Sequence, residues 1–106
     1  MEELTPFESR VQEILSDLQS TLYSKNADYG DSHAKLTEEL GETVILVRLM
    51  DMLNRLKQLL LSEYKARVNE SIEDTLKDLA GYAILELERR QRIVCSPLIK
   101  KGDLVK

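Results

Sequence analysis

The feature that most constrains this sequence is a helical segment, residues 42–61, that is apolar around nearly its whole circumference. Its apolar side chains are Val44, Ile45, Leu46, Val47, Leu49, Met50, Met52, Leu53, Leu56, Leu59, Leu60 and Leu61. A helix of this kind lies at the centre of a bundle or in an interface between subunits. We therefore expect a helical bundle that associates into a homo-oligomer, a dimer or a tetramer, because a chain this small gains core by self-association.

Three of the charged residues in this apolar segment, Arg48, Asp51 and Arg55, form a stripe at positions i, i+3 and i+7. Charged side chains on a mostly buried helix must be paired or must face a ligand. Two interpretations stay open. The three residues line a binding site or a buried network, or they form a narrow solvated stripe in which Asp51 pairs with Arg55.

The rest of the chain is also predicted to be helical. Its apolar residues recur at helical spacing, and four glycines, two prolines and 5% aromatic residues are too few for a β-sandwich or barrel. Thr5, followed by proline, predicts a helix start, and we expect this first helix to end near residue 24. A turn-rich loop is expected over residues 25–32, and then a short helix from about His33 that Gly41 interrupts.

The second half of the chain predicts two long helices. The apolar helix runs to about residue 62, and a polar connection follows over residues 63–69. Ser71, with Asp74 three residues later, resembles a capping box and predicts a last helix from Ser71 to about residue 93. The fold class is therefore all-α, a bundle of three long helices and one short helix, with a single domain over residues 1–95 and a C-terminal tail over residues 96–106.

Charge and cysteine content limit the partners and the compartment. The formal net charge of −4 disfavours general binding to duplex nucleic acid, although a local basic pocket could still take a small anion. Cys95, the one cysteine, cannot form a disulfide within the chain, which is compatible with a reducing cytoplasm. We expect no signal peptide and no membrane span, because the N-terminus is acidic and the apolar segment carries several charges. The expected location is cytoplasmic.

Two groups of acidic residues have the spacing of metal ligands. Asp74 and Asp78 lie one helical turn apart, and Glu38 and Glu42 lie one turn apart with Glu39 beside them. Paired carboxylates can share a Mg²⁺ ion, which keeps water ligands and binds phosphates. The alternative is an ordinary set of solvated acids, which the helix dipole favours near a helix start.

The predicted loop holds two groups that suit a nucleotide. Lys25 could meet a phosphate as a point charge, and Tyr29 could stack on a base, although a Tyr-Gly pair in a loop is also common in plain turns. His33 is the one histidine, and we expect it on the surface, in the first turn of its helix. Cys95 is expected to be packed and not catalytic.

Three blocks of sequence, residues 25–32, 47–56 and 69–83, resemble the nucleotide modification associated domain 1 family, whose members are small and often phage-encoded. The resemblance extends over about residues 8–90. This family looks similar to the MazG-like all-α nucleoside triphosphate pyrophosphohydrolases, helical oligomers that bind Mg²⁺ through E-E-x-x-E and E-x-x-D motifs. Residues 38–42 match the first motif. In the second, Asp78 takes the place of the aspartate, Thr75 stands in place of the glutamate, and Asp74 is displaced by one residue.

The resemblance implies a nucleotide-binding protein of nucleotide metabolism or modification, and it implies Mg²⁺-dependent pyrophosphohydrolase activity if the metal site is complete. The implied catalytic residues are Asp78 and Glu39, and the implied metal ligands are Glu39, Glu42, Asp74 and Asp78. The implied nucleotide-binding residues are Lys25, Asp28, Tyr29, Arg48, Asp51 and Arg55. Two alternatives stay open: a phage protein that sequesters a nucleotide without turnover, and a structural helical interaction subunit.

Overall fold

A computed structural model describes residues 3–29, 31–61 and 65–95 of the chain. These residues form four helices and no strand: α1 (Pro6–Tyr29), α2 (Ser32–Leu40), α3 (Thr43–Leu60) and α4 (Lys65–Cys95). The all-α prediction, with three long helices and one short helix, is therefore confirmed for the described ranges. The chain divides into two compact units, Met1–Ser32 and His33–Lys106, and each is described by itself. The predicted tail over residues 96–106 lies outside the described residues.

The first unit consists of α1, whose start is fixed by a reciprocal pair of hydrogen bonds. The backbone N–H of Glu8 donates to Thr5 Oγ1 (3.1 Å), and the backbone N–H of Thr5 donates to Glu8 Oε1 (2.9 Å). This capping box satisfies two backbone donors that a helix start leaves free. The predicted cap at Thr5 is confirmed, and Glu8 completes it.

The end of α1 differs from the prediction. The helix continues to Tyr29, so the loop expected from residue 25 is wrong for residues 25–29. Asparagine and aspartate cost a helix less than about 0.7 kcal/mol each relative to alanine, so they do not by themselves end it. Asp31, with φ 68°, follows in the left-handed region and stands just before α2.

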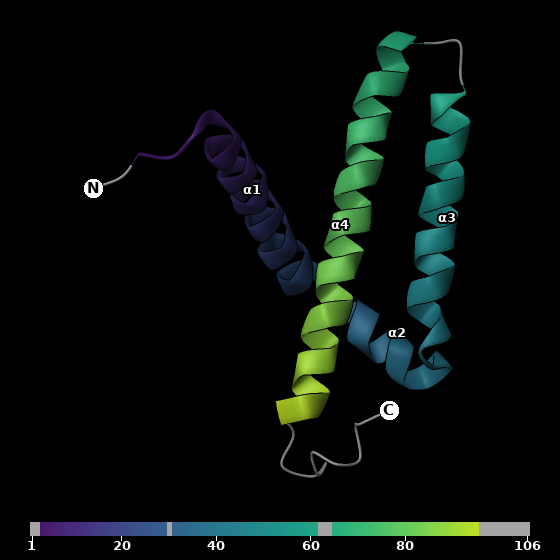
Figure 1. The fold of residues 1–106 in the computed structure, drawn as a ribbon. Coiled ribbons are helices and arrows are strands. Elements are labelled where there is room, and N and C mark those ends of the chain that lie inside the picture. The colour runs from purple at the N-terminus through teal and green to yellow at the C-terminus, as the bar shows by residue number, and fades with distance from the viewer. Residues whose placement is uncertain (1–2, 30, 62–64, 96–106) are drawn as a thin grey trace. The chain divides into compact units, whose positions relative to one another are not determined.

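The second unit is built on α3 and α4, which run antiparallel and side by side, while α2 lies across the end where α3 begins (Figure 1). The side of α3 that faces α4 is buried or partly buried, and it comprises Val44, Ile45, Arg48, Leu49, Met52, Leu56 and Leu59. These positions recur every three or four residues, as one helix face requires. The opposite side of α3 is exposed, so the helix is covered from one side in a single chain.

Two helix boundaries in this unit were predicted from the sequence, and one of the two predictions is confirmed. Gly41 has φ +92° and its N–H donates to the carbonyl of Thr37 (2.7 Å), so it ends α2 as expected for a glycine in this conformation. The polar connection expected over residues 63–69 is wrong from Lys65 onward, because α4 begins there. Ser71 is therefore inside α4 and not at its cap, and its carbonyl accepts a hydrogen bond from Thr75 Oγ1 (2.8 Å). Polar residues such as lysine and arginine are good helix formers, so polarity alone did not mark a loop.

Within the described part of the chain, no helix combines the length and the apolar character needed to cross a lipid bilayer.

Candidate functional site

Arg48 on α3 and Tyr82 on α4 are in direct contact within the second unit. Arg48 Nη1 donates a hydrogen bond to the Tyr82 hydroxyl (3.1 Å), and the guanidinium carbon lies 4.8 Å from the centre of the Tyr82 ring. Arg48 comes from the side of α3 that faces α4, so the segment around it places the cation against the aromatic ring. The ring attracts the guanidinium through its quadrupole, which fixes the side chain without neutralising its charge.

His33 and Glu86 join α2 to α4 beside this contact. His33 Nε2 lies 3.0 Å from Glu86 Oε1, and the two residues are only 5% and 7% exposed. The His33 ring also meets Tyr82 edge-on, with ring centres 5.9 Å apart. Tyr82 thus contacts both His33 and Arg48, and we call His33, Arg48, Tyr82 and Glu86 the polar cluster.

Glu86 is held as a carboxylate by its neighbours. It accepts hydrogen bonds from Arg89 (3.0 and 2.8 Å) and from Arg90 Nε (2.8 Å). Arg89 lowers the pKa of Glu86 most, and His33 and Arg90 lower it further against the opposing effect of burial, so that the pKa falls from 4.5 to about 2. The same contact with Glu86 raises the pKa of Arg89. Because an ionised carboxylate only accepts hydrogen bonds, His33 Nε2 carries a hydrogen and donates it.

Glu42 belongs to a network next to the polar cluster in which positive and negative groups are equal in number. Its Oε1 accepts from Arg89 Nη2 (3.2 Å) and from Arg90 Nη2 (3.0 Å). The network therefore contains two carboxylates, Glu42 and Glu86, and two guanidinium groups, Arg89 and Arg90. These charges neutralise one another, and Arg48 stands outside the set.

Two buried nitrogen atoms of the polar cluster have no hydrogen-bond partner among the described residues, Arg48 Nε and His33 Nδ1. A buried polar atom without a partner loses its hydration without compensation, at a cost of about 1–3 kcal/mol. Such an atom calls for an explanation, and a ligand that supplies the missing partner is one. For Arg48 the missing partner is an acceptor, because Nε only donates.

The predicted nucleotide-binding residues lie in different parts of the structure. Arg48 belongs to the polar cluster, whereas Asp51 and Arg55 are exposed on α3, and no ion pair joins them within the described ranges. A buried network of all three residues is therefore not present. Lys25 is exposed on α1, in the other unit, and the side chains of Asp28 and Tyr29 lie outside the described residues.

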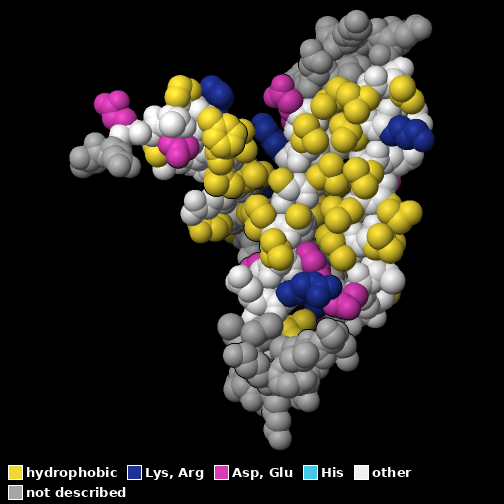
Figure 2. Space-filling view, viewed as in Figure 1, with side chains coloured by type: hydrophobic (Ala, Val, Ile, Leu, Met, Phe, Trp, Pro, Cys, Tyr) yellow, Lys and Arg dark blue, Asp and Glu magenta, His cyan; other side chains and the backbone are white. Residues whose placement is uncertain are grey.

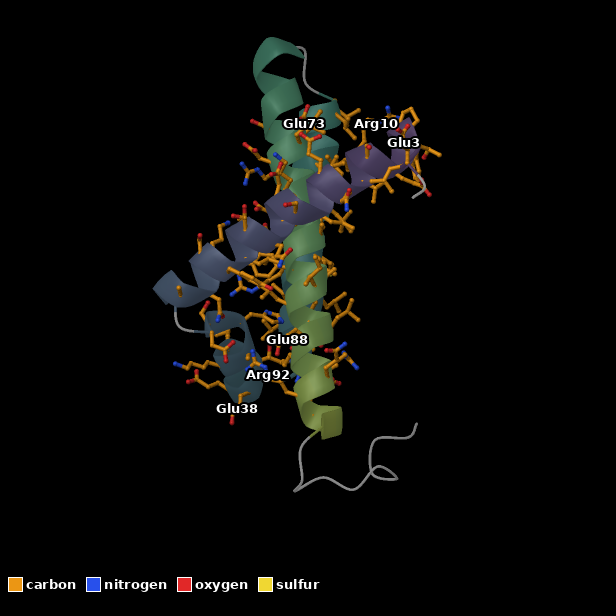
Figure 3. The ribbon with its side chains drawn as sticks, turned by 90° about the vertical axis from the view of Figure 1, so that its left-hand side faces the viewer. Glu3, Arg10, Glu38, Glu73, Glu88 and Arg92 are labelled. Carbon is orange, nitrogen blue, oxygen red and sulfur yellow. The ribbon has the colours of Figure 1, made fainter. Side chains whose placement is uncertain are left out.

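The predicted metal ligands do not come together. Glu39 and Asp74 are exposed, Asp78 is half-buried, and Glu42 is engaged by Arg89 and Arg90. On α4, Asp78 and Asp74 precede Arg89 by 11 and 15 residues, which is about 16 Å and 22 Å along a helix axis. In Figure 3, Glu38 on α2 and Glu73 on α4, the sequence neighbours of Glu39 and Asp74, lie far apart along the unit.

The four predicted metal ligands could hold one Mg²⁺ ion only if their side chains lay close together. In the part of the chain with assigned positions, no three His, Cys, Asp or Glu side chains form a group that could hold a metal ion. Thr75, which occupies the glutamate place of the second motif, is 1% exposed and packed in the interior. The described residues therefore do not fit a shared Mg²⁺ site in this arrangement, and the catalytic roles implied for Glu39 and Asp78 stay a prediction.

Sequence reasoning missed most of the polar cluster. His33 was expected on the surface, and this is wrong, because its ring is buried against Glu86 and Tyr82. The available signal was local: Glu86 stands between leucines with Arg89 and Arg90 one turn later, a pattern that pairs a buried acid with basic residues. Nothing in the spacing linked Glu86 to His33, which is 53 residues away.

A family model described as nucleotide modification associated domain 1 matches residues 25–88, more than half of the 106 residues. The matched range includes all four residues of the polar cluster and ends one residue before Arg89. No curated protein and no solved structure is significantly similar to the chain.

Proposed function

The chain belongs to the nucleotide modification associated domain 1 family, and we propose that it binds a nucleotide through the polar cluster, with Arg48 holding a phosphate group. The observation that carries this proposal is the state of Arg48. Its guanidinium is partly buried, its Nε lacks an acceptor, and no carboxylate among the described residues pairs with it.

A phosphate group suits this position chemically. Removing a cation from water is costly unless an anion compensates it. The nearby acids do not supply that anion, because Glu42 and Glu86 are engaged by Arg89 and Arg90. A phosphate beside the guanidinium would accept from Nε and a terminal nitrogen together, in the bidentate geometry that arginine favours.

The proposed activity is binding without turnover. Hydrolysis of the MazG-like type would require the acids at positions 39, 42, 74 and 78 to share a metal ion. In support of binding alone, Glu42 is already paired with two arginines, and Asp74 and Asp78 lie far along α4 from those arginines. A protein of this kind would sequester a nucleotide or present it to a partner.

A thermal-unfolding screen tests the proposal. The probes are ATP, GTP, dCTP and dTTP, the corresponding mono- and diphosphates, and inorganic pyrophosphate, each with EDTA and with Mg²⁺. We expect at least one nucleotide to raise the melting temperature in EDTA, because a ligand that binds the folded state stabilises it in proportion to its occupancy. Pyrophosphate release is assayed on the same mixtures, and none is expected.

Two results would contradict the proposal. If no nucleotide shifts the melting temperature at millimolar concentration, the polar cluster is a structural network. If pyrophosphate is released only with Mg²⁺, the acids assemble into a working metal site and the protein is an enzyme.

A further inference from the structure

The outward side of α3 carries an apolar stripe that the second unit leaves uncovered. Leu46, Met50, Leu53 and Leu60 follow one another at intervals of four, three and seven residues, and they are 54–62% exposed. Lys57 occupies the position between Leu53 and Leu60 in the same stripe. Figure 2 shows hydrophobic side chains gathered over α3 and the adjoining part of α4.

The spacing of this stripe is that of a coiled-coil seam. Alternating steps of four and three residues place Leu46, Leu53 and Leu60 at every d position, and Met50 and Lys57 at the a positions. Leucine at d is typical of paired helices. The residues that face α4, among them Val44, Arg48 and Met52, lie on the other side of α3, so the seam is additional to the intramolecular contact.

We propose that a second copy of this chain covers the seam, with the two α3 helices packed antiparallel about a two-fold axis near Leu53. In this arrangement Leu46 meets Leu60 of the second copy, and Lys57 lies beside Met50 of the second copy. The stem of Lys57 then packs on apolar surface while its ammonium reaches water. A parallel pair would instead place two Lys57 side chains against each other at an a position, where like charges repel.

The exposed apolar area is sufficient for such a pair. With the flanking Val47 and Leu61, which are 63% and 75% exposed, six large apolar side chains line this side of α3. At on the order of 100 Å² each, two copies would bury roughly 1,200 Å². That total reaches the lower end of the range for stable interfaces, and the roughly 600 Å² on each copy is at the upper end of the largest apolar patch that a typical monomer exposes.

Sedimentation analysis of the full chain at 5–100 µM tests the association. We expect a dimer for the parent, a shift to the monomer mass for Leu53→Glu, and an unchanged dimer for Leu87→Glu. Leu87 is a matched control because it is also an exposed leucine, at 62% against 54% for Leu53, and it lies on α4. A monomeric parent would overturn the proposal, and so would a Leu53→Glu variant that stays dimeric.

Disulfide trapping tests the orientation, and it also serves if Leu53→Glu fails to fold. In a Cys95→Ser background, an equimolar mixture of Leu46→Cys and Leu60→Cys chains is expected to form the mixed cross-link under mild oxidation. Each variant alone is expected to stay uncross-linked. Cross-linking of Leu46→Cys with itself, without the mixed product, would show a parallel pair and overturn the antiparallel assignment. The seam shares no residue with the polar cluster, so these results are independent of nucleotide binding.

Discussion

His33 Nε2 donates a 3.0 Å hydrogen bond to Glu86 Oε1 across 53 residues of sequence, and both side chains are buried. The bond joins the short helix α2 to the C-terminal half of α4. Because Glu86 also accepts from Arg89 and Arg90, and both arginines bind Glu42, the loop between α2 and α3 is tied to the same point. This arrangement holds Tyr82, and with it Arg48, in a fixed position.

Glu86→Gln is expected to lower the free energy of unfolding by roughly 3 kcal/mol, because removing one partner of a buried ionic network leaves the other charges uncompensated. Glu88→Gln is the matched control. Glu88 pairs with Arg92 on the same helix but is exposed, and we expect a change within about 0.5 kcal/mol. Urea denaturation at pH 7 measures both. Equal effects of the two substitutions would show that the burial of Glu86 contributes nothing.

Stability is also expected to depend on pH through Glu86. Its pKa in the folded chain is about 2, below the ordinary value of 4.5, because Arg89, His33 and Arg90 hold the charged form. A carboxyl group with a lowered pKa stabilises the fold fully above pH 4.5, and this contribution is lost as the pH falls toward 2. The loss amounts to on the order of 3 kcal/mol. Unfolding measured from pH 6 to pH 2.5 should therefore show a steeper decline for the parent than for Glu86→Gln, and parallel curves would contradict this.

Thr75→Glu introduces the glutamate of the E-x-x-D motif that the MazG-like enzymes have, yet we expect it to destabilise the chain. Thr75 is 1% exposed, so a glutamate there would bring a longer, charged side chain into the interior. Thr75→Val is the control, since it keeps the volume and loses only the hydroxyl bond to the Ser71 carbonyl. Thermal unfolding with and without 5 mM Mg²⁺ separates the possibilities. Stabilisation of Thr75→Glu by Mg²⁺ would show that the acids at positions 39, 42, 74 and 78 do assemble into a metal site.

The helices were largely predictable because their signals are local. Thr5 with the following proline marked the start of α1, and Gly41 marked the end of α2. The predictions at residue 25 and at Ser71 are wrong because the polar residues there are compatible with a helix as well as with a loop. Tertiary packing and helix propensity together decided those ends, and short-range patterns carry little information about them.

Only one residue of the candidate site was predicted from the sequence. Arg48 was singled out because a charge on an apolar helix needs a partner, and the structure places it against Tyr82. Asp51 and Arg55 shared its spacing but not its surroundings, because α3 is covered on one side only. The contact between His33 and Glu86 could not be predicted from the sequence. It depends on how α2 crosses α4, and no periodic pattern in the sequence indicates that crossing.

Titration calorimetry on Arg48 variants tests nucleotide binding by the polar cluster most directly. The probe is the nucleotide that gives the largest thermal shift in EDTA, and the proteins are the parent, Arg48→Ala, Arg48→Lys and Arg55→Ala. Arg55 lies two turns further along α3 and is exposed, so its substitution controls for a general loss of positive charge and tests its predicted role in binding. We expect Arg48→Ala to weaken binding at least tenfold, Arg48→Lys to recover only part of it, and Arg55→Ala to stay within about twofold. Unchanged affinity in Arg48→Ala, or an equal loss in Arg55→Ala, would contradict the assignment of the phosphate to Arg48.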